Sequence, residues 1–136
     1  MIQSLAETTH SSFIPYGESH SGERDMIDWA RVAELRDEIG PEDFSEVLEL
    51  FLSEVENAID LLEGATGNPI VTEEQMHFLK GASLNLGFAD LAALCQRGER
   101  AAAQGDAGAI PPGGVRETFE ASKLAFEKDF PVRFAA

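Results

Sequence analysis

Cysteine is nearly absent from this 136-residue chain, which has Cys95 alone. A single cysteine excludes an intrachain disulfide and a cysteine-based zinc site, and it fits a reducing compartment. Cys95 lies on an apolar helical stripe in the segment LAALCQRGE. We therefore interpret it as a small buried hydrophobic residue rather than a reactive thiol.

Positive charge is also scarce, because 10 Lys and Arg residues face 25 acidic residues and the formal net charge is -15. Such a charge repels nucleic acid phosphates and anionic membrane surfaces unless the basic residues cluster, and here they do not. We therefore expect neither a nucleic-acid partner nor a membrane partner.

Long apolar runs are missing too. No run of about 18 apolar residues could span a bilayer, and the first residues, MIQSLAETTHSSF, lack the basic start and the apolar stretch of a signal peptide. These absences predict a cytoplasmic protein. Alternation with a period of two, which would indicate strands, is absent as well.

Helical patterns are present from residue 28 onward. Asp28 can cap a short helix that Gly40 closes. Pro41 is typical of a helix start, and it opens a long helix over residues 41–64. Spacings of four and three residues place one apolar face of this helix towards a core: Phe44, Leu48, Phe51, Val55, Ala58 and Leu62.

Two more helices follow a break after residue 64. Thr72 and Gln75 form a capping-box pattern that predicts the start of the third helix, and Gly87 ends it. A fourth helix is expected over residues 89–104, closed by Gly105.

A fifth helix is expected after the loop GDAGAIPPGG. It covers residues 115–130 and stops before Pro131, because proline interrupts the helical hydrogen bonds. Its predicted inward stripe is Val115, Phe119, Ser122 and Phe126.

These patterns predict an all-α fold, an antiparallel four-helix bundle with an additional short N-terminal helix. Residues 1–24 are rich in Ser, Gly, Glu and Thr and have no sustained apolar period. We expect residues 1–24 to be a flexible N-terminal arm and residues 25–136 to be the bundle domain.

His77 lies in the segment MHFLKGASLNLG, where a glycine interrupts an otherwise helical pattern at a cost of ~1 kcal/mol relative to alanine. At about 100 degrees per residue, Leu79 and Leu86 fall opposite His77. They would face the core, so His77 is predicted to point to solvent.

The neighbours of His77 indicate more than a solvated polar residue. Lys80 lies one turn on, where its ammonium can reach a phosphoryl group on the imidazole. Gly81 removes a side chain from the same surface, so another protein can come close to the ring. Leu84 and Phe88 are expected to leave apolar area for docking. Together they describe a nucleophile on a docking surface.

The residues of this segment closely resemble the signature H-x-L-K-G-x-S-x-N-L-G of the histidine-containing phosphotransfer (HPt) family: His77, Lys80, Gly81, Ser83, Asn85, Leu86 and Gly87. The resemblance covers about residues 28 to 130. The chain departs from the family pattern at Met76, where a small residue is common, and at Gly98, where a large apolar residue is usual. We expect Met76 to change packing beside the histidine helix. Gly98 should let two helices approach closely, or weaken the fourth helix by ~1 kcal/mol.

The resemblance implies a phosphorelay intermediate. His77 would accept a phosphoryl group through Nε2 from a phospho-aspartate of a response-regulator receiver domain and return it to another receiver. Lys80 would neutralise charge. Ser83, Asn85 and Gly87 would belong to the structural motif, with Ser83 in packing and hydrogen bonding.

The partners implied are receiver domains and a hybrid sensor histidine kinase, and the chain is expected to act as a monomer. No cofactor or metal is expected on this chain, because no aspartate cluster surrounds His77; Mg²⁺ should belong to the receiver. No autokinase activity is expected, because about 50 residues after His77 are too few for a nucleotide-binding domain. The kinase phospho-acceptor pattern H-E-x-x-x-P is also missing.

Two alternatives remain open. Glu74 and His77 have the Glu-x-x-His spacing of di-iron bundles, but such a site needs two copies and the sequence has one. The same surface could instead dock a receiver without phosphoryl transfer.

Overall fold

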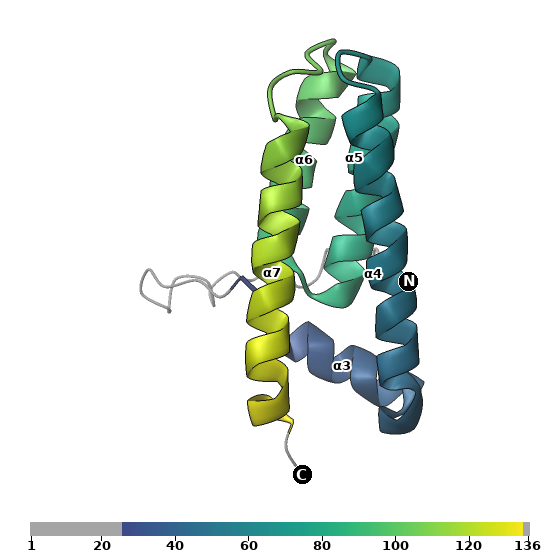
Figure 1. Cartoon of the computed structure of the whole chain (residues 1–136), viewed down its shortest axis with the longest axis vertical. Helices are drawn as coiled ribbons and strands as arrows, with labels where there is room; N and C mark the ends of the chain where they lie inside the picture. Colours follow the sequence, from purple (N-terminus) through teal and green to yellow (C-terminus); the bar gives the residue numbers. More distant parts are fainter. Residues whose placement is uncertain (1–25, 135–136) are drawn as a thin grey trace.

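Two long helices and two shorter ones pack side by side in the computed structural model, which describes residues 26–134 (Figure 1). The described residues form five helices: α3 (Trp29–Ile39), α4 (Pro41–Gly64), α5 (Pro69–Leu86), α6 (Ala89–Ala103) and α7 (Pro112–Arg133). The predicted all-α bundle with a short N-terminal helix is confirmed. The expected arm, residues 1–24, lies outside the described residues.

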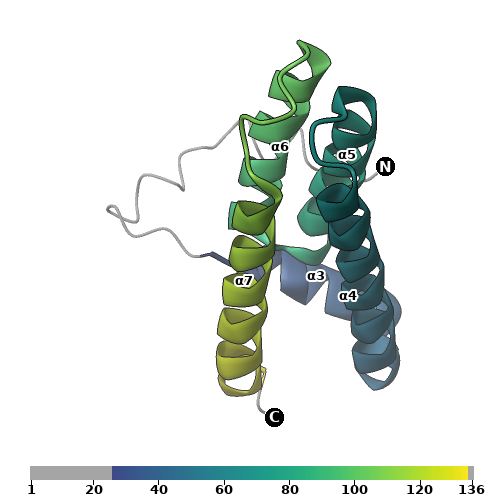
Figure 2. The same ribbon diagram turned by 45° about the horizontal axis from the view of Figure 1, so that its top comes forward.

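Figure 1 and Figure 2 show α4 and α7 in front of α5 and α6, with neighbouring helices antiparallel. The helices α5 and α6 have 18 and 15 residues, against 24 and 22 in α4 and α7. The helix α3 lies across the end that the shorter pair leaves open (Figure 1). No helix in residues 26–134 combines the length and the apolar character needed to cross a bilayer.

The start of α3 and the α3–α4 junction are as predicted. The Asp28 carboxylate accepts a hydrogen bond of 3.2 Å from the backbone N–H of Arg31 at the start of α3. Gly40 follows α3 with a φ of 101°, a conformation that costs glycine little. Pro41 is then the first residue of α4. Local sequence therefore determines this corner.

Two helices begin earlier than predicted. The capping box of Thr72 and Gln75 is wrong, because Asn68 caps α5 through two backbone N–H groups at 3.1 and 3.2 Å. Pro69 then occupies the first helical position, and Thr72 is buried inside the first turn. The helix α7 likewise begins at Pro112 rather than at residue 115. Asn followed by Pro is a start signal as good as the capping box.

The predicted stop before Pro131 is also wrong, because α7 continues to Arg133. Proline in the last turn removes one backbone hydrogen bond from the helix. Aromatic packing offsets this loss, since the Phe130 ring lies 5.5 Å from that of Phe44 and 4.8 Å from that of Phe134. The contact with Phe44 of α4 is tertiary, and it stabilises the helix past the proline.

The C-terminal end of α5 is fixed to the start of α3. Gly87 has a φ of 88°, and a Cβ there would lie 2.9 Å from the carbonyl oxygen of Asp28. The Asp28 N–H donates to the Gly87 carbonyl at 2.7 Å. Gly87 therefore ends the helix as predicted and also permits a close backbone contact.

Candidate functional site

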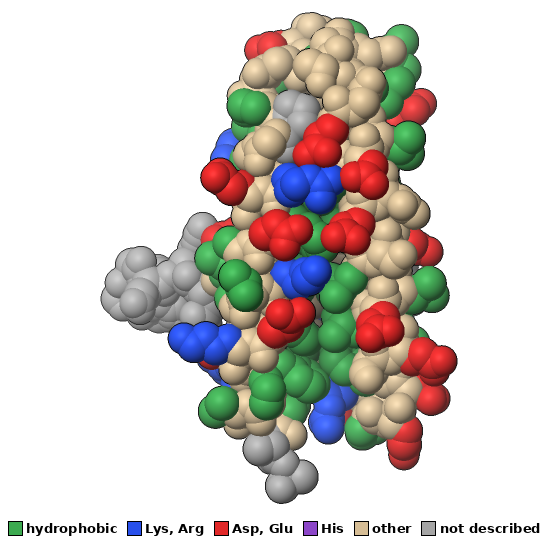
Figure 3. Space-filling model, viewed as in Figure 1, with side chains coloured by type: hydrophobic (Ala, Val, Ile, Leu, Met, Phe, Trp, Pro, Cys, Tyr) green, Lys and Arg blue, Asp and Glu red, His purple; other side chains and the backbone are tan. Residues whose placement is uncertain are grey.

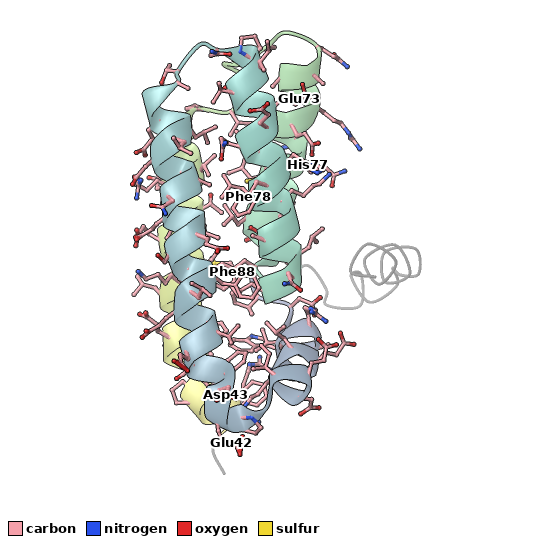
Figure 4. All side chains as sticks on the ribbon, turned by 90° about the vertical axis from the view of Figure 1, so that its right-hand side faces the viewer. Glu42, Asp43, Glu73, His77, Phe78 and Phe88 are labelled. Carbon is pink, nitrogen blue, oxygen red and sulfur yellow. The ribbon has the colours of Figure 1, made fainter. Side chains whose placement is uncertain are left out.

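His77 lies on the exposed face of α5. Its side chain is 68% exposed, and the core face of the helix is formed by other residues: Thr72, Met76, Leu79, Ser83 and Leu86. Figure 4 shows His77 at the edge of α5, on the same side as Glu73. The outward direction predicted from the helical period is confirmed.

Glu99 from α6 contacts the imidazole. His77 Nδ1 lies 2.8 Å from Glu99 Oε2. An ionised carboxylate can only accept, so the proton of the neutral ring sits on Nδ1 and Nδ1–H donates to Glu99. The lone pair of the ring is then on Nε2, the nitrogen that Glu99 does not contact.

Lys80 contacts the same carboxylate. Its Nζ lies 2.8 Å from Glu99 Oε1, an oxygen without solvent exposure. Burial raises the pKa of Glu99, but the hydrogen bonds and charges of Lys80 and His77 outweigh it and hold this pKa below its ordinary value. Lys80 is thus one turn from His77 as expected, with its ammonium held by Glu99.

Sequence reasoning missed Glu99, which is on another helix. A geometric signal existed, because Glu99 follows the turn at Phe88 by as many residues as His77 precedes it. In an antiparallel helix pair such positions lie opposite one another. Without knowing the turn and the rotation of α6, this signal does not distinguish Glu99 from its neighbours.

The predicted docking residues divide into two groups. A Cβ on Gly81 would meet nothing within 4 Å, and Leu84 is 40% exposed, so both lie on the accessible face. Phe88 does not, because it is 1% exposed and its ring centroid lies 6.4 and 6.0 Å from those of Phe119 and Phe126. The left-handed turn at Gly87 directs Phe88 into the core. Its assignment to the docking surface is therefore wrong.

An open hollow of about 410 Å³ lies beside the histidine and involves residues not predicted for the site. Its lining residues are Ile70, Glu73, Glu74, His77 and Glu99. Three glutamates therefore surround the imidazole, where the sequence showed no aspartate cluster. In residues 26–134, no group of three or more His, Cys, Asp or Glu is arranged to hold a metal ion.

Two further motif residues, Ser83 and Asn85, differ in their hydrogen bonding. Ser83 is buried, but its Oγ has no hydrogen-bond partner among the described residues, so the predicted hydrogen bond is not found. Asn85 accepts from Arg31 twice, at Oδ1 (2.8 Å) and at its backbone carbonyl (3.0 Å). Because Arg31 belongs to α3, these bonds fix the end of the histidine helix.

Cys95 is buried in α6, as predicted. Burial, with a smaller effect of the Glu99 charge, raises the pKa of its thiol to about 12. The thiol stays protonated at neutral pH and is a poor nucleophile.

On the opposite face, α4 and α7 carry interspersed acidic and basic side chains (Figure 3). Arg116 from α7 ion-pairs with Asp60 at 2.7 Å and with Glu63 at 2.8 Å, both from α4. The guanidinium hydrogen bond holds the pKa of Glu63 below its ordinary value. On this face Asp60 and Glu63 therefore share one cationic partner, Arg116.

A family model described as Hpt domain matches residues 46–123, more than half of the chain, including all of α5 and α6. No curated protein and no solved structure matches the chain.

Proposed function

The chain belongs to the Hpt domain family, whose members carry out phosphotransfer in phosphorelay signalling, and we propose that it is a relay intermediate phosphorylated on His77. The donor is a phospho-aspartyl receiver domain, and the acceptor is the receiver domain of another response regulator. The observation that carries this proposal is the 2.8 Å contact between His77 Nδ1 and Glu99 Oε2. It leaves Nε2 with a lone pair on the exposed face.

The transfer step needs no base on this chain. The Nε2 lone pair attacks the phosphorus of the aspartyl phosphate, the bond from phosphorus to the aspartate oxygen breaks, and the aspartate leaves as a carboxylate. The phosphorylated ring keeps the proton on Nδ1 and gains positive charge, which the Glu99 carboxylate stabilises. Transfer to the next receiver is the reverse step on a different aspartate.

Lys80 supports this step through Glu99. Its ammonium, 2.8 Å from Oε1, keeps the carboxylate ionised and oriented towards His77. Metal chemistry is assigned to the receiver, which would supply Mg²⁺ at its aspartate. This chain contributes the position of the His77 ring, its Nδ1–H tautomer and an accessible Nε2.

The proposal is tested with a panel of receiver domains carrying labelled aspartyl phosphate. We expect at least one to pass its label to this protein, on an acid-labile and alkali-stable phosphohistidine at position 77. A folded protein that binds receivers and never takes label would instead support the docking module without transfer. Label on any other residue would contradict the assignment of His77.

Replacement of Glu99 tests the tautomer. In Glu99→Gln the charge that holds the proton on Nδ1 is lost, and we expect phosphoryl acceptance to slow by roughly tenfold, because the hydrogen bond that stabilises the positive ring is no longer charge-assisted. Nitrogen NMR shifts of His77 should report the Nδ1–H form in the wild type and a mixture in the variant. Lys80→Ala, which keeps the carboxylate, should slow transfer less and leave receiver binding unchanged. A wild-type ring protonated on Nε2 would contradict the mechanism.

Replacement of Gly81 tests access to the ring. Gly81→Ala should hold or raise stability, by at most ~1 kcal/mol, because alanine is the better helix residue and its Cβ meets open space. Gly81→Leu should fold equally well, yet its bulk beside His77 should weaken receiver binding and transfer, since a small transient interface of about 1,200 Å² or less tolerates displacement poorly. Calorimetric titration against a receiver measures this. Equal affinities for glycine and leucine would show that Gly81 does not serve access.

A further inference from the structure

Two glutamates near His77 line the hollow beside it without a partner of opposite charge in residues 26–134. Glu73 and Glu74 lie one turn before the histidine on α5 and line the hollow beside it. Among the described residues, neither carboxylate makes an ion pair or a hydrogen bond. Figure 4 shows Glu73 and His77 on the same side of the helix.

The nearby lysine does not offset these charges. The Lys80 ammonium is 2.8 Å from Glu99, and the charges of that pair cancel at short range. Two carboxylates on the opposite face, Asp60 and Glu63, are different, because Arg116 bridges them. The residues that line the hollow beside the nucleophile include three glutamates and no Lys or Arg, although the reaction there brings in a phosphoryl dianion.

Negative charge at this position affects phosphodonors unequally. A free anionic phosphodonor is repelled, because charges a few ångströms apart near a surface interact strongly. A protein donor that places Lys or Arg side chains opposite the two carboxylates is attracted instead. Charge complementarity therefore defines the kind of partner that fits this surface.

We propose that Glu73 and Glu74 are specificity-determining residues, which select a receiver domain presenting cationic side chains to the hollow and disfavour small anionic phosphodonors. This inference rests on the proposed function, because it concerns the partner of the same histidine. It assigns no part in the bond-making step to either glutamate.

The test compares Glu73→Gln/Glu74→Gln with a matched control, Glu117→Gln/Glu120→Gln. The control removes the same charge from exposed positions on α7, which lies diagonally across the bundle from α5 (Figure 1). Three reagents are used: phosphoramidate, a small anionic phosphodonor; diethyl pyrocarbonate, a neutral reagent for imidazole; and the receiver that labels the wild type fastest. Phosphohistidine is followed by phosphorus NMR, and receiver transfer is measured at low and at high ionic strength.

The expected signature is a pair of changes with opposite sign. Phosphorylation by phosphoramidate should become about threefold to tenfold faster in Glu73→Gln/Glu74→Gln, because repulsion is removed. Transfer from the receiver at low salt should become roughly tenfold slower, and the difference should shrink at high salt. The diethyl pyrocarbonate rate should stay unchanged, and the control variant should match the wild type with every reagent.

Changes of the same sign with phosphoramidate and receiver would overturn the inference, as would effects equal to those of the control. A parallel loss with all three reagents would mean that the substitutions rearrange the hollow, which also overturns it. Failure of every receiver to label the wild type counts against the proposed function instead. In that case the phosphoramidate rates of the wild type and Glu73→Gln/Glu74→Gln still measure how strongly the two carboxylates repel an anionic phosphodonor.

Discussion

Replacement of His77 by glutamine is expected to abolish phosphoryl acceptance while leaving the folded bundle intact. The ring is 68% exposed, so its removal opens no cavity, and exposed substitutions usually change the free energy of unfolding by about 0.5 kcal/mol or less. The glutamine amide can still donate to Glu99, which keeps that carboxylate paired. It has no basic nitrogen and cannot attack phosphorus.

The measurement pairs label transfer from a phosphorylated receiver with thermal unfolding of both proteins. The sequence supplies a matched control, because it contains two other histidines, His10 and His20. A His10→Gln/His20→Gln variant should accept label at the wild-type rate. Residual label on His77→Gln would identify another acceptor, and unfolding of that variant would mean that the imidazole is structural.

Local patterns were sufficient for the number and order of the helices and for the direction of His77, although the starts of α5 and α7 and the end of α7 were predicted wrongly. Helical period alone placed Leu79 and Leu86 opposite the histidine, and both are buried. The period works here because the face of a helix depends only on the spacing along one segment. The same reasoning correctly placed Gly81 and Leu84 on the accessible face.

Features that depend on packing against a second helix were either missed or predicted wrongly. Glu99 reaches His77 because α6 packs against α5, and no local pattern encodes that contact. Phe88 was expected to leave apolar area for docking, but it is 1% exposed and packs against Phe119 and Phe126 of α7. Pro131 was treated as a stop, because the stacking of Phe130 on Phe44 is tertiary. At Pro131 a long-range contact outweighed a local preference, whereas Glu99 could be found only from the packing of α6 on α5.

The two departures from the family pattern, Met76 and Gly98, compensate each other in space. A Cβ on Gly98 would lie 2.7 Å from Met76 Cε, 2.8 Å from Sδ and 3.3 Å from Cγ. Met76 is 1% exposed, so its side chain occupies the volume that a large residue at position 98 would fill. The predicted close approach at Gly98 is thus one of a side chain rather than of two bare backbones. Met76 of α5 therefore fills the space beside Gly98 of α6, and the core stays full at this contact.

This exchange predicts strong coupling between the two positions. Met76→Ala should lower the free energy of unfolding by about 2–5 kcal/mol, because it leaves a cavity. Gly98→Leu should cost about 1–3 kcal/mol through overpacking, although leucine favours the helix. The double variant restores the volume with the large side chain on α6 instead of α5. It should therefore be more stable than Met76→Ala, and its loss in free energy of unfolding should be far smaller than the sum of the two single losses.

Denaturant unfolding of all four proteins measures the coupling, with Gly81→Leu as a control that inserts the same side chain into open space. Additive losses would show that Met76 and Gly98 are independent; a coupling of about 2 kcal/mol or more would show that Gly98 accommodates the methionine packed beneath the histidine helix.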